Sequence, residues 1–308
     1  MKQVFVFLLV LFSLYGVSAR AVILNDSLPP GKNFEKAAFR LWYPDDLKNI
    51  RAIVVLVPGS NGDGRNQVAD TAWQRLANQN GLALLGCYFA DSKHPDQDIE
   101  LYVQAGEGSC QALIDIISRF AKNSGHLEMA GSPLLMWGHS AGGQFNYEFA
   151  CWKPERVLGF VVNKGGIYYT AIASAAARHV PGIFFTGEKD LEFRSDIIRG
   201  IFAVNRRFGA LWTIAEEPGA GHEVGKTKKL SIDFFKEILS LRLFPDAGGP
   251  SENQKCRQLQ ETSGFVGDPK THQVVPFSQR QKTRYPTAWL PTAGFSEKWL
   301  AFFGGESF

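Results

Sequence analysis

Two hydrophobic patterns alternate along the chain, one typical of buried strands and the other of helices. Residues 52–57 are a continuous apolar run rich in β-branched side chains, which predicts a strand buried on both faces. Residues 68–80 carry apolar side chains at helical spacing and end at Gly81, a typical helix C-cap. The predicted strands are residues 38–44 (an alternating edge strand), 52–57, 82–89, 134–137, 157–162, 182–186 and 210–215. The predicted helices are residues 68–80, 108–122, 144–150, 170–178, 195–208 and 226–243.

Strand and helix therefore alternate six times. This order predicts an α/β fold, a doubly wound and mostly parallel sheet with helices on both faces. In such sheets functional loops gather beyond the carboxyl ends of the strands.

The two ends of the chain follow different patterns. Lys2, the apolar run 4–14 and the small residues Val17-Ser18-Ala19 predict a signal peptide over residues 1–19. The apolar run is short for a bilayer span, so we expect a secreted or periplasmic protein without stable membrane insertion. Residues 20–244 form the predicted main domain. Residues 245–308 begin with a Pro- and Gly-rich linker and are expected to pack back on that domain, because they are too few for a core of their own.

Composition narrows the range of functions. The 308 residues are 45% hydrophobic, which supports a full core, and the net charge is +3. No dense Lys/Arg stripe occurs, so we expect no nucleic-acid partner. Four cysteines match no zinc-binding spacing, and we expect no metal site. Either one or two disulfides or buried free thiols are compatible with the cysteine spacing.

The most informative motif is Gly138-His139-Ser140-Ala141-Gly142. It follows an apolar strand and precedes a helix, which is the context of a nucleophile elbow. The tight turn would expose the Ser140 hydroxyl, and the backbone N–H of Ala141 would point the same way at the helix N-terminus. We therefore predict that Ser140 is a nucleophile.

A serine hydroxyl needs a base and a group that orients the base. His222 lies in a glycine-rich loop after the last strand, which favours it as the base. His139 is expected to face away from the site as a structural residue. The remaining histidines lack such a setting and are expected at surface or structural positions: His94, His126, His179 and His272.

The favoured residue to orient the His222 imidazole is Asp190. It follows the predicted strand 182–186, and His222 follows the next strand along the chain, 210–215. Its rivals are Glu188 and Glu192 in the same turn and Asp196, an expected first-turn acid of the next helix. The order Ser140, Asp190, His222 is the order found in α/β-hydrolases and differs from the trypsin-like and subtilisin-like orders.

An oxyanion would need two fixed N–H donors. Ala141 supplies one, and the glycine-rich loop after the 52–57 strand supplies the other, from Ser60 or, as the second choice, Asn61. No phosphate-binding glycine motif occurs, and no cofactor is expected. Three residues on strand-end loops are possible substrate contacts: Asp91, His94 and Lys164.

With these elements in place, the chain resembles the α/β-hydrolase superfamily, and more narrowly the secreted esterases grouped with poly(3-hydroxybutyrate) depolymerases and feruloyl or acetylxylan esterases. The resemblance covers residues 38 to about 243 and rests on Val54-Val55-Leu56-Val57-Pro58-Gly59-Ser60, Trp73 with Leu76-Ala77 and Gly81, Gly138-His139-Ser140-Ala141-Gly142-Gly143, Thr186-Gly187-Glu188-Lys189-Asp190 and Pro218-Gly219-Ala220-Gly221-His222-Glu223. Members usually carry His-Gly where this chain has Pro58-Gly59. The resemblance therefore does not specify which residue of this loop donates the second N–H to the oxyanion.

The resemblance implies a secreted serine hydrolase that cleaves small-molecule or polymeric carboxylic esters through an acyl-enzyme. Two alternatives remain. A serine peptidase of the oligopeptidase kind shares the triad and sheet, but such enzymes usually carry another large domain. A non-catalytic binding protein on the same scaffold would normally have lost a triad member, and none is lost here.

Overall fold

The computed structural model describes residues 20–91, 100–244, 256–281, 283 and 285–304. The predicted signal peptide (1–19), the predicted linker (245–250) and His94 lie outside these residues. Export of the protein therefore stays a prediction from the sequence.

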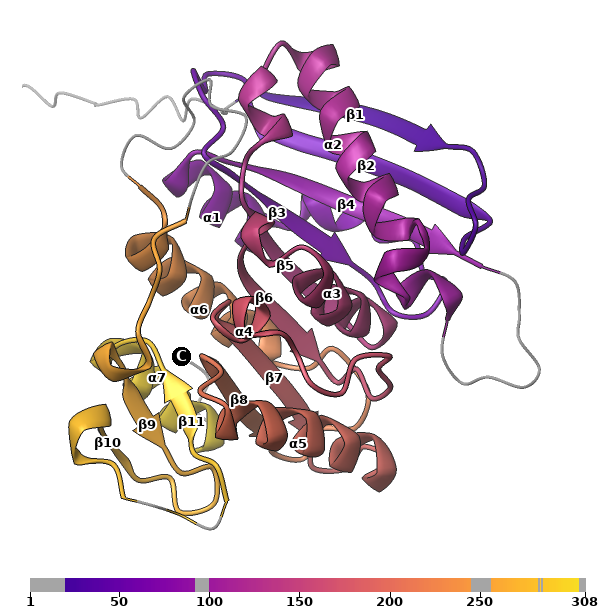
Figure 1. Cartoon of the computed structure of the whole chain (residues 1–308). Helices are drawn as coiled ribbons and strands as arrows, with labels where there is room; N and C mark the ends of the chain where they lie inside the picture. Colours follow the sequence, from indigo (N-terminus) through magenta and orange to yellow (C-terminus); the bar gives the residue numbers. More distant parts are fainter. Residues whose placement is uncertain (1–19, 92–99, 245–255, 282, 284, 305–308) are drawn as a thin grey trace, which may run out of the picture.

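The main domain is built on one eight-stranded sheet with the order β1-β2-β4-β3-β5-β6-β7-β8 (Figure 1). The strands β1 and β2 pair antiparallel, as do β2 and β4, and every pairing from β4 through β8 is parallel. The strands are β1 (Ala21–Leu28), β2 (Lys36–Pro44), β3 (Ala52–Val57), β4 (Leu82–Ala90), β5 (Leu134–His139), β6 (Val157–Asn163), β7 (Gly182–Gly187) and β8 (Trp212–Glu217).

Helices cover both faces of the sheet. In Figure 1, α2, α3, α4 and α5 lie on the near face, and α1 and α6 lie together on the far face. The helices are α1 (Thr71–Asn80), α2 (Ser109–Ser124), α3 (Ala141–Trp152), α4 (Ala175–Arg178), α5 (Glu192–Arg207) and α6 (Thr227–Arg242). The predicted fold class, a doubly wound and mostly parallel sheet, is confirmed.

The N-terminal edge of the sheet differs from the prediction. The segment Ala21–Leu28, where no strand is predicted, is strand β1 and pairs along most of β2. Its side chains alternate between exposed and half-buried, so a solvent-facing strand carries the polar residues Asn25 and Ser27 at no cost to the core. β2 is consequently an internal strand, and the prediction that it lies at the edge is wrong.

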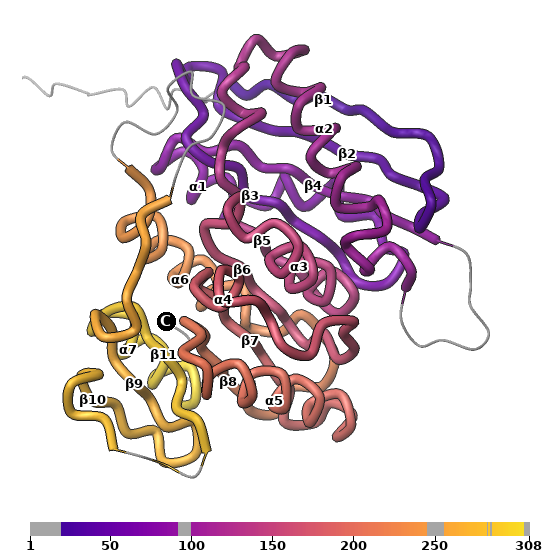
Figure 2. The backbone as a smooth tube through the Cα atoms, viewed as in Figure 1, coloured from indigo at the N-terminus to yellow at the C-terminus, as the bar shows by residue number. Residues whose placement is uncertain are grey.

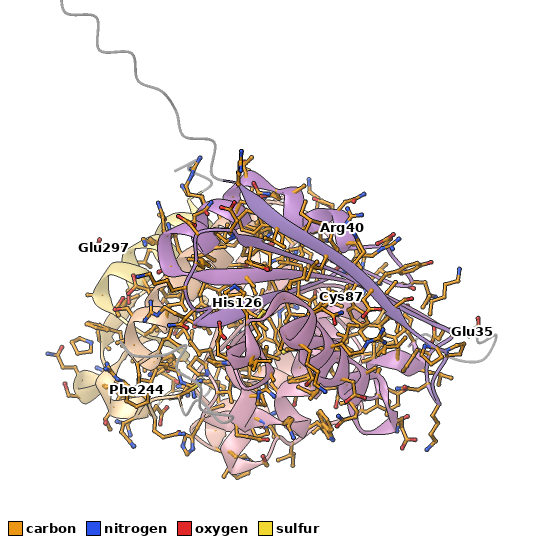
Figure 3. All side chains as sticks on the ribbon, turned by 90° about the horizontal axis from the view of Figure 1, so that it is seen from above. Glu35, Arg40, Cys87, His126, Phe244 and Glu297 are labelled. Carbon is orange, nitrogen blue, oxygen red and sulfur yellow. The ribbon has the colours of Figure 1, made fainter. Side chains whose placement is uncertain are left out.

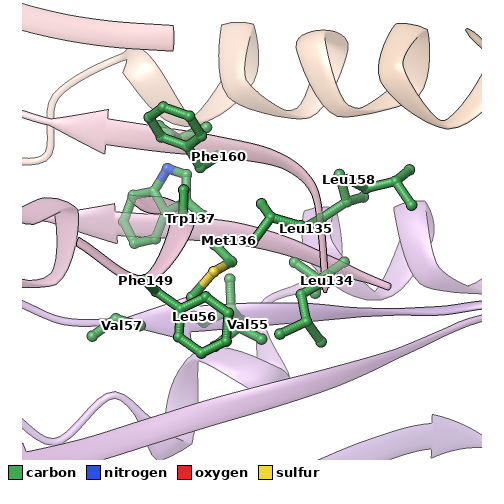
Figure 4. Packing of buried hydrophobic residues seen from close by; sticks show 14 of the residues in the cluster. Val55, Leu56, Val57, Leu134, Leu135, Met136, Trp137, Phe149, Leu158 and Phe160 are labelled. Atoms are coloured by element: carbon green, nitrogen blue, oxygen red, sulfur yellow. The ribbon is translucent and has the colours of Figure 1, made fainter. Parts of the chain in front are cut away.

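The core lies between the central strands and the helices on both faces. It includes Val55 of β3, Met136 of β5, Phe160 of β6 and Phe149 of α3, all fully buried. Figure 4 shows these strands and side chains from close by, and Figure 3 shows the side chains around the whole core. Burial of strands on both faces explains why their sequences are continuously apolar rather than alternating.

The described part of the C-terminal extension packs beside β8 (Figures 1 and 2). It forms a three-stranded antiparallel sheet, β10-β9-β11, and a last helix; the elements are β9 (Phe265–Gly267), β10 (Val274–Pro276), β11 (Ala288–Leu290) and α7 (Ala293–Phe303). Trp299 is fully buried and donates from Nε1 to the backbone carbonyl of Ile214 at 2.9 Å. The extension is thus fixed to the sheet by buried aromatic side chains.

All four cysteines are free thiols, and Cys87 and Cys110 are buried. Among the described residues no group of side chains could hold a metal ion. No helix in the described part of the chain has both the length and the apolar content that crossing a bilayer requires.

Candidate active site

Ser140 occupies a strained turn between β5 and α3. Its backbone has φ 52° and ψ −124°, a conformation that L-residues rarely adopt. A Cβ at Gly138 would lie 2.2 Å from the carbonyl oxygen of Gly142, and a Cβ at Gly142 would lie 2.2 Å from that of Val57. Both positions therefore require glycine, and the motif has the strand–turn–helix geometry that is typical of a nucleophile elbow.

The structure brings Ser140, His222 and Asp190 together in one chain of hydrogen bonds. The Nε2 atom of His222 lies 2.9 Å from the Ser140 hydroxyl, and its Nδ1 atom lies 3.0 Å from Oδ2 of Asp190. Asp190 follows β7 and His222 follows β8, so the carboxyl ends of three strands supply the three side chains. The Asp190 side chain is only 2% exposed, whereas that of His222 is 36% exposed.

The Asp190 carboxylate is held in its ionised form. Burial raises its pKa, but the hydrogen bonds from His222 and from the backbone N–H of Leu191 outweigh this effect and lower the pKa below its ordinary value. Of the rival acids, Glu188 accepts the N–H of Gly219, and Asp196 is largely exposed and pairs with a helix arginine. Glu192 is exposed in the first turn of α5. Among the described residues the hydrogen-bond partners of the His222 ring are Ser140, Asp190 and Arg194, so none of the three rivals contacts it.

Arg194 also contacts this group, although the sequence reasoning did not single it out. Its Nη1 donates to Oδ1 of Asp190 and lies 3.0 Å from Nδ1 of His222. Arg194 is four residues after Asp190 and belongs to the first turns of α5. A basic residue four positions after the predicted acid, at the start of a helix, is the sequence signal that could have identified it.

His139 faces the site, and the prediction that it faces away is wrong. Its ring centroid lies 5.1 Å from that of His222, with 42° between the ring planes. Burial lowers the pKa of His139 to about 4, and the neighbouring charges of His222 and Lys164 act in the same direction. His139 therefore stays neutral beside His222.

The loop after β3 lies against the elbow. A Cβ on Gly59 would meet the Cβ of Ser140 at 3.6 Å. The backbone N–H of Asn61 is engaged, because it donates to the Tyr102 hydroxyl at 3.2 Å. This favours Ser60 over Asn61 as the donor facing Ser140.

Ala141 is the first residue of α3. Its N–H therefore has no acceptor within the helix and remains available to an oxyanion.

The three predicted substrate contacts have different positions. His94 lies outside the described residues. Asp91 is buried; its N–H donates to the side chain of Asn61 at 2.9 Å, and its carboxylate accepts the N–H of Leu101. Asp91 thereby supports the donor loop.

Lys164 is fully buried, so the prediction that it contacts substrate is wrong. Its Nζ donates to Oε2 of Glu217 at 2.8 Å and to the backbone carbonyl of Glu223 at 2.7 Å. Its backbone has φ 60°, which turns the chain at the end of β6. The side chain is thereby directed toward the loop that carries His222.

This His222 loop is held by further contacts from the strand ends. The side chain of Asn163 donates to the carbonyl of Val224 at 3.1 Å, and Glu217 accepts the N–H of Lys226 through its second oxygen. The backbone N–H of Lys189 donates to the carbonyl of Ala220 at 2.8 Å. The loop is therefore held on both sides of His222 by hydrogen bonds, two of them from the buried side chains of Asn163 and Glu217.

A separate cavity of about 800 Å³ lies between α5, the strands β7 and β8, and the C-terminal extension. None of its lining residues belongs to the Ser140–His222–Asp190 group. Its walls come from Thr186, Arg199, Gly200, Phe202, Ala203, Ile214, Glu216, Asp268, Pro269, Lys270, Thr283, Tyr285 and Pro286.

No protein-family model matches the sequence, and no curated protein sequence matches it. Solved structures do match. A ferulic acid esterase has a TM-score of 0.54 at 12% identity, over 71% of this chain and 98% of that one. A poly(3-hydroxybutyrate) depolymerase from Bordetella parapertussis has 0.51 at 16% identity, over 74% and 92%. Poly(aspartic acid) hydrolase-1 from Sphingomonas sp. KT-1 has 0.50 at 16% identity, over 68% and 97%. At these identities the comparisons show a shared fold.

Proposed function

We propose that this chain, which has the α/β-hydrolase fold, is a serine hydrolase that cleaves carboxylic esters through an acyl-enzyme intermediate. The observation that carries the proposal is the unbroken hydrogen-bond chain from Asp190 through His222 to Ser140, which ends on a hydroxyl exposed by the strained elbow. This arrangement supplies a nucleophile, a base and a group that orients the base.

In the first half-reaction the Ser140 oxygen attacks the ester carbonyl carbon while Nε2 of His222 takes the hydroxyl proton. The negative charge that develops on the carbonyl oxygen is stabilised by the N–H groups of Ala141 and Ser60. Asp190 stabilises the imidazolium that forms. The bond between the carbonyl carbon and the alcohol oxygen then breaks, and the alcohol leaves with the proton from His222.

In the second half-reaction a water molecule replaces the alcohol. His222 takes one proton from the water as its oxygen attacks the acyl carbon. The bond to the Ser140 oxygen breaks, the proton returns to that oxygen, and the carboxylic acid is released. The cycle thus needs only the side chains described above, two backbone donors and water.

Two of the three fold neighbours named above support ester substrates. One is named a ferulic acid esterase, and another is named a depolymerase of poly(3-hydroxybutyrate), which is a polyester. The two alternatives, a serine peptidase of the oligopeptidase kind and a non-catalytic binding protein, are separated from the proposal by the substrates they turn over. A peptidase would cleave peptide amides at rates that rival ester cleavage, and a binding protein would cleave neither.

The test compares the intact protein with Ser140→Ala on 4-nitrophenyl acetate and butyrate, with labelling by a fluorophosphonate as a second measurement. We expect Ser140→Ala to lower kcat/KM by at least about 10³-fold and to abolish labelling, because removing the nucleophile leaves only the oxyanion hole and binding. Ser118→Ala, a helix serine that bonds to the Ile114 carbonyl, is the matched control and should change neither. Intact protein that neither hydrolyses an ester nor reacts with the phosphonate would contradict the proposal.

A further inference from the structure

Arg194 places a permanent positive charge against two members of the triad. Its Nη1 donates to Asp190 and lies 3.0 Å from Nδ1 of His222. A guanidinium stays protonated at every pH a protein experiences, and it can donate hydrogen bonds but never accept them.

This contact conflicts with the protonation state that a base needs. For His222 to accept the Ser140 proton at Nε2, its own proton must be on Nδ1, where it is donated to Asp190. Arg194 can hydrogen-bond to Nδ1 only when that atom carries no proton. It therefore stabilises the opposite tautomer, in which Nε2 already carries a proton and cannot take another from Ser140.

The charge of Arg194 acts in the same direction. When His222 becomes an imidazolium, a second cation lies beside it, and the Asp190 carboxylate must balance both. His139, the other ring against His222, is neutral and offers no compensation. Arg194 therefore opposes the proton transfer that the proposed mechanism requires.

The remaining donors of Arg194 are available to a ligand. Its side chain is 20% exposed, and among the described residues Nε and Nη2 have no hydrogen-bond partner. The Nε–Nη2 edge of a guanidinium matches the two oxygens of a carboxylate. A carboxylate bound there would balance the charge of Arg194 and leave Asp190 to His222.

We propose that Arg194 makes the enzyme selective for esters that carry a carboxylate close to the scissile bond, because only such a substrate neutralises the cation that opposes His222. This inference rests on the proposed ester hydrolysis and names its substrate class. The anionic group contributes to binding and also to kcat, since its effect on His222 is largest when the imidazolium forms.

The guanidinium of Arg194 can be displaced without removing its charge, by a substitution that crowds the aliphatic part of the side chain. A Cβ on Gly166, in the loop after β6, would lie 1.9 Å from Cγ of Arg194. Gly166→Ala therefore forces the Arg194 side chain away from its present path, whereas Arg194→Gln removes its charge. Arg199→Gln, on the same helix but paired with Asp196 and Glu216, is the matched control.

The experiment measures kcat and KM for two esters of similar length, 4-nitrophenyl butyrate and mono-4-nitrophenyl glutarate, which carries a terminal carboxylate. We expect the intact enzyme to prefer the glutarate in kcat/KM by at least about tenfold, the size of one charge-assisted hydrogen bond. Arg194→Gln should remove most of this preference and raise kcat for the butyrate, because the cation that opposes protonation of His222 is gone. Gly166→Ala should reduce the preference, and Arg199→Gln should retain it.

The opposite outcomes separate the two proposals. An intact enzyme without preference for the glutarate overturns the assignment of Arg194, and so does an Arg194→Gln variant that loses the same factor on both esters, since that result means Arg194 only holds Asp190 in place. Phosphonate labelling of Ser140 in either case leaves the serine hydrolase intact. Absence of both labelling and hydrolysis overturns the proposed function itself.

Discussion

Two basic side chains flank the loop and ring of His222, and they differ in burial. Lys164 is 0% exposed and pairs with Glu217, whereas Arg194 is 20% exposed and pairs with Asp190. A fully buried charge is tolerated only when it is paired and hydrogen-bonded. Lys164 meets this condition with one carboxylate and one backbone carbonyl, so its group is closed to ligands. Arg194 keeps unused donors and is open to them.

The two cations also act on different parts of the site. Lys164 acts on the backbone of the His222 loop, through the carbonyl of Glu223, and so determines where the imidazole lies. Arg194 acts on the imidazole and its carboxylate directly. The degree of burial thus distinguishes a charge that positions the site from one that can respond to substrate.

The largest expected effect on stability comes from removing the charge of Lys164, the fully buried cation of the two. Lys164→Met leaves Glu217 buried without its partner, and we expect the free energy of unfolding in urea to fall by about 3–5 kcal/mol. The double variant Lys164→Met with Glu217→Leu should recover much of this loss, because it leaves no unpaired charge. Lys228→Met is the control: its pair with Asp70 is 37% and 33% exposed and should contribute at most about 1 kcal/mol.

A small loss in Lys164→Met, similar to that in Lys228→Met, would contradict the structural assignment of Lys164. Recovery of stability in the double variant without recovery of kcat would be informative, since it would show that the Lys164 contact positions His222 in addition to stabilising the fold.

The grouping of Ser140, His222 and Asp190 could be predicted from the sequence because each of these residues follows a predicted strand. Ser140 lies in an elbow motif, Asp190 ends one strand and His222 lies in a glycine-rich loop after the next. In a parallel sheet these strand ends share one edge, so the order of elements alone brings the residues together.

The direction of side chains on the same loops could not be predicted. Lys164 follows a strand as the triad residues do, but its positive φ turns the side chain inward. The side of His139 is likewise not predictable from the motif, which specifies the turn at Ser140 but not the direction of the preceding side chain at the end of β5. β1 was missed because its alternation is only half-buried, with polar residues in its centre.

His139 is a third basic group beside His222, and it differs from both cations: it is half-buried and loses its charge instead of pairing with a carboxylate. In the folded protein burial lowers the pKa of His139 to about 4, against an ordinary value of about 6.5 for an unfolded chain. Between these values the unfolded state binds more protons, so stability should fall as the pH falls from about 6.5 to about 4. We expect a loss of roughly 2–3 kcal/mol from this residue.

Urea unfolding at pH 7.5, 5.5 and 4.5 measures this effect. His139→Gln should remove most of the loss over this range, and His179→Gln, at an exposed position, should leave it unchanged. The lowered pKa of Asp190 makes stability fall further only as the pH drops below the ordinary aspartate value of about 3.9, so the two contributions occupy different ranges. An equal loss in His139→Gln and in the intact protein would show that His139 titrates normally.

The smallest expected effect on stability comes from removing the charge of Arg194, the partly exposed cation. Arg194→Gln should lower the free energy of unfolding by about 1 kcal/mol or less, because the Arg194 side chain is partly exposed and the buried Asp190 carboxylate keeps other hydrogen bonds. The glutamine amide can still donate to Oδ1 of Asp190, and that carboxylate keeps its hydrogen bonds from His222 and from the N–H of Leu191. Urea unfolding of this variant, measured together with Lys164→Met, tests the prediction.

If Arg194→Gln destabilises the fold as much as Lys164→Met does, burial does not distinguish the two cations, and Arg194 has a structural role in the site. A small loss of stability together with a changed preference between the two esters assigns Arg194 to the chemistry instead.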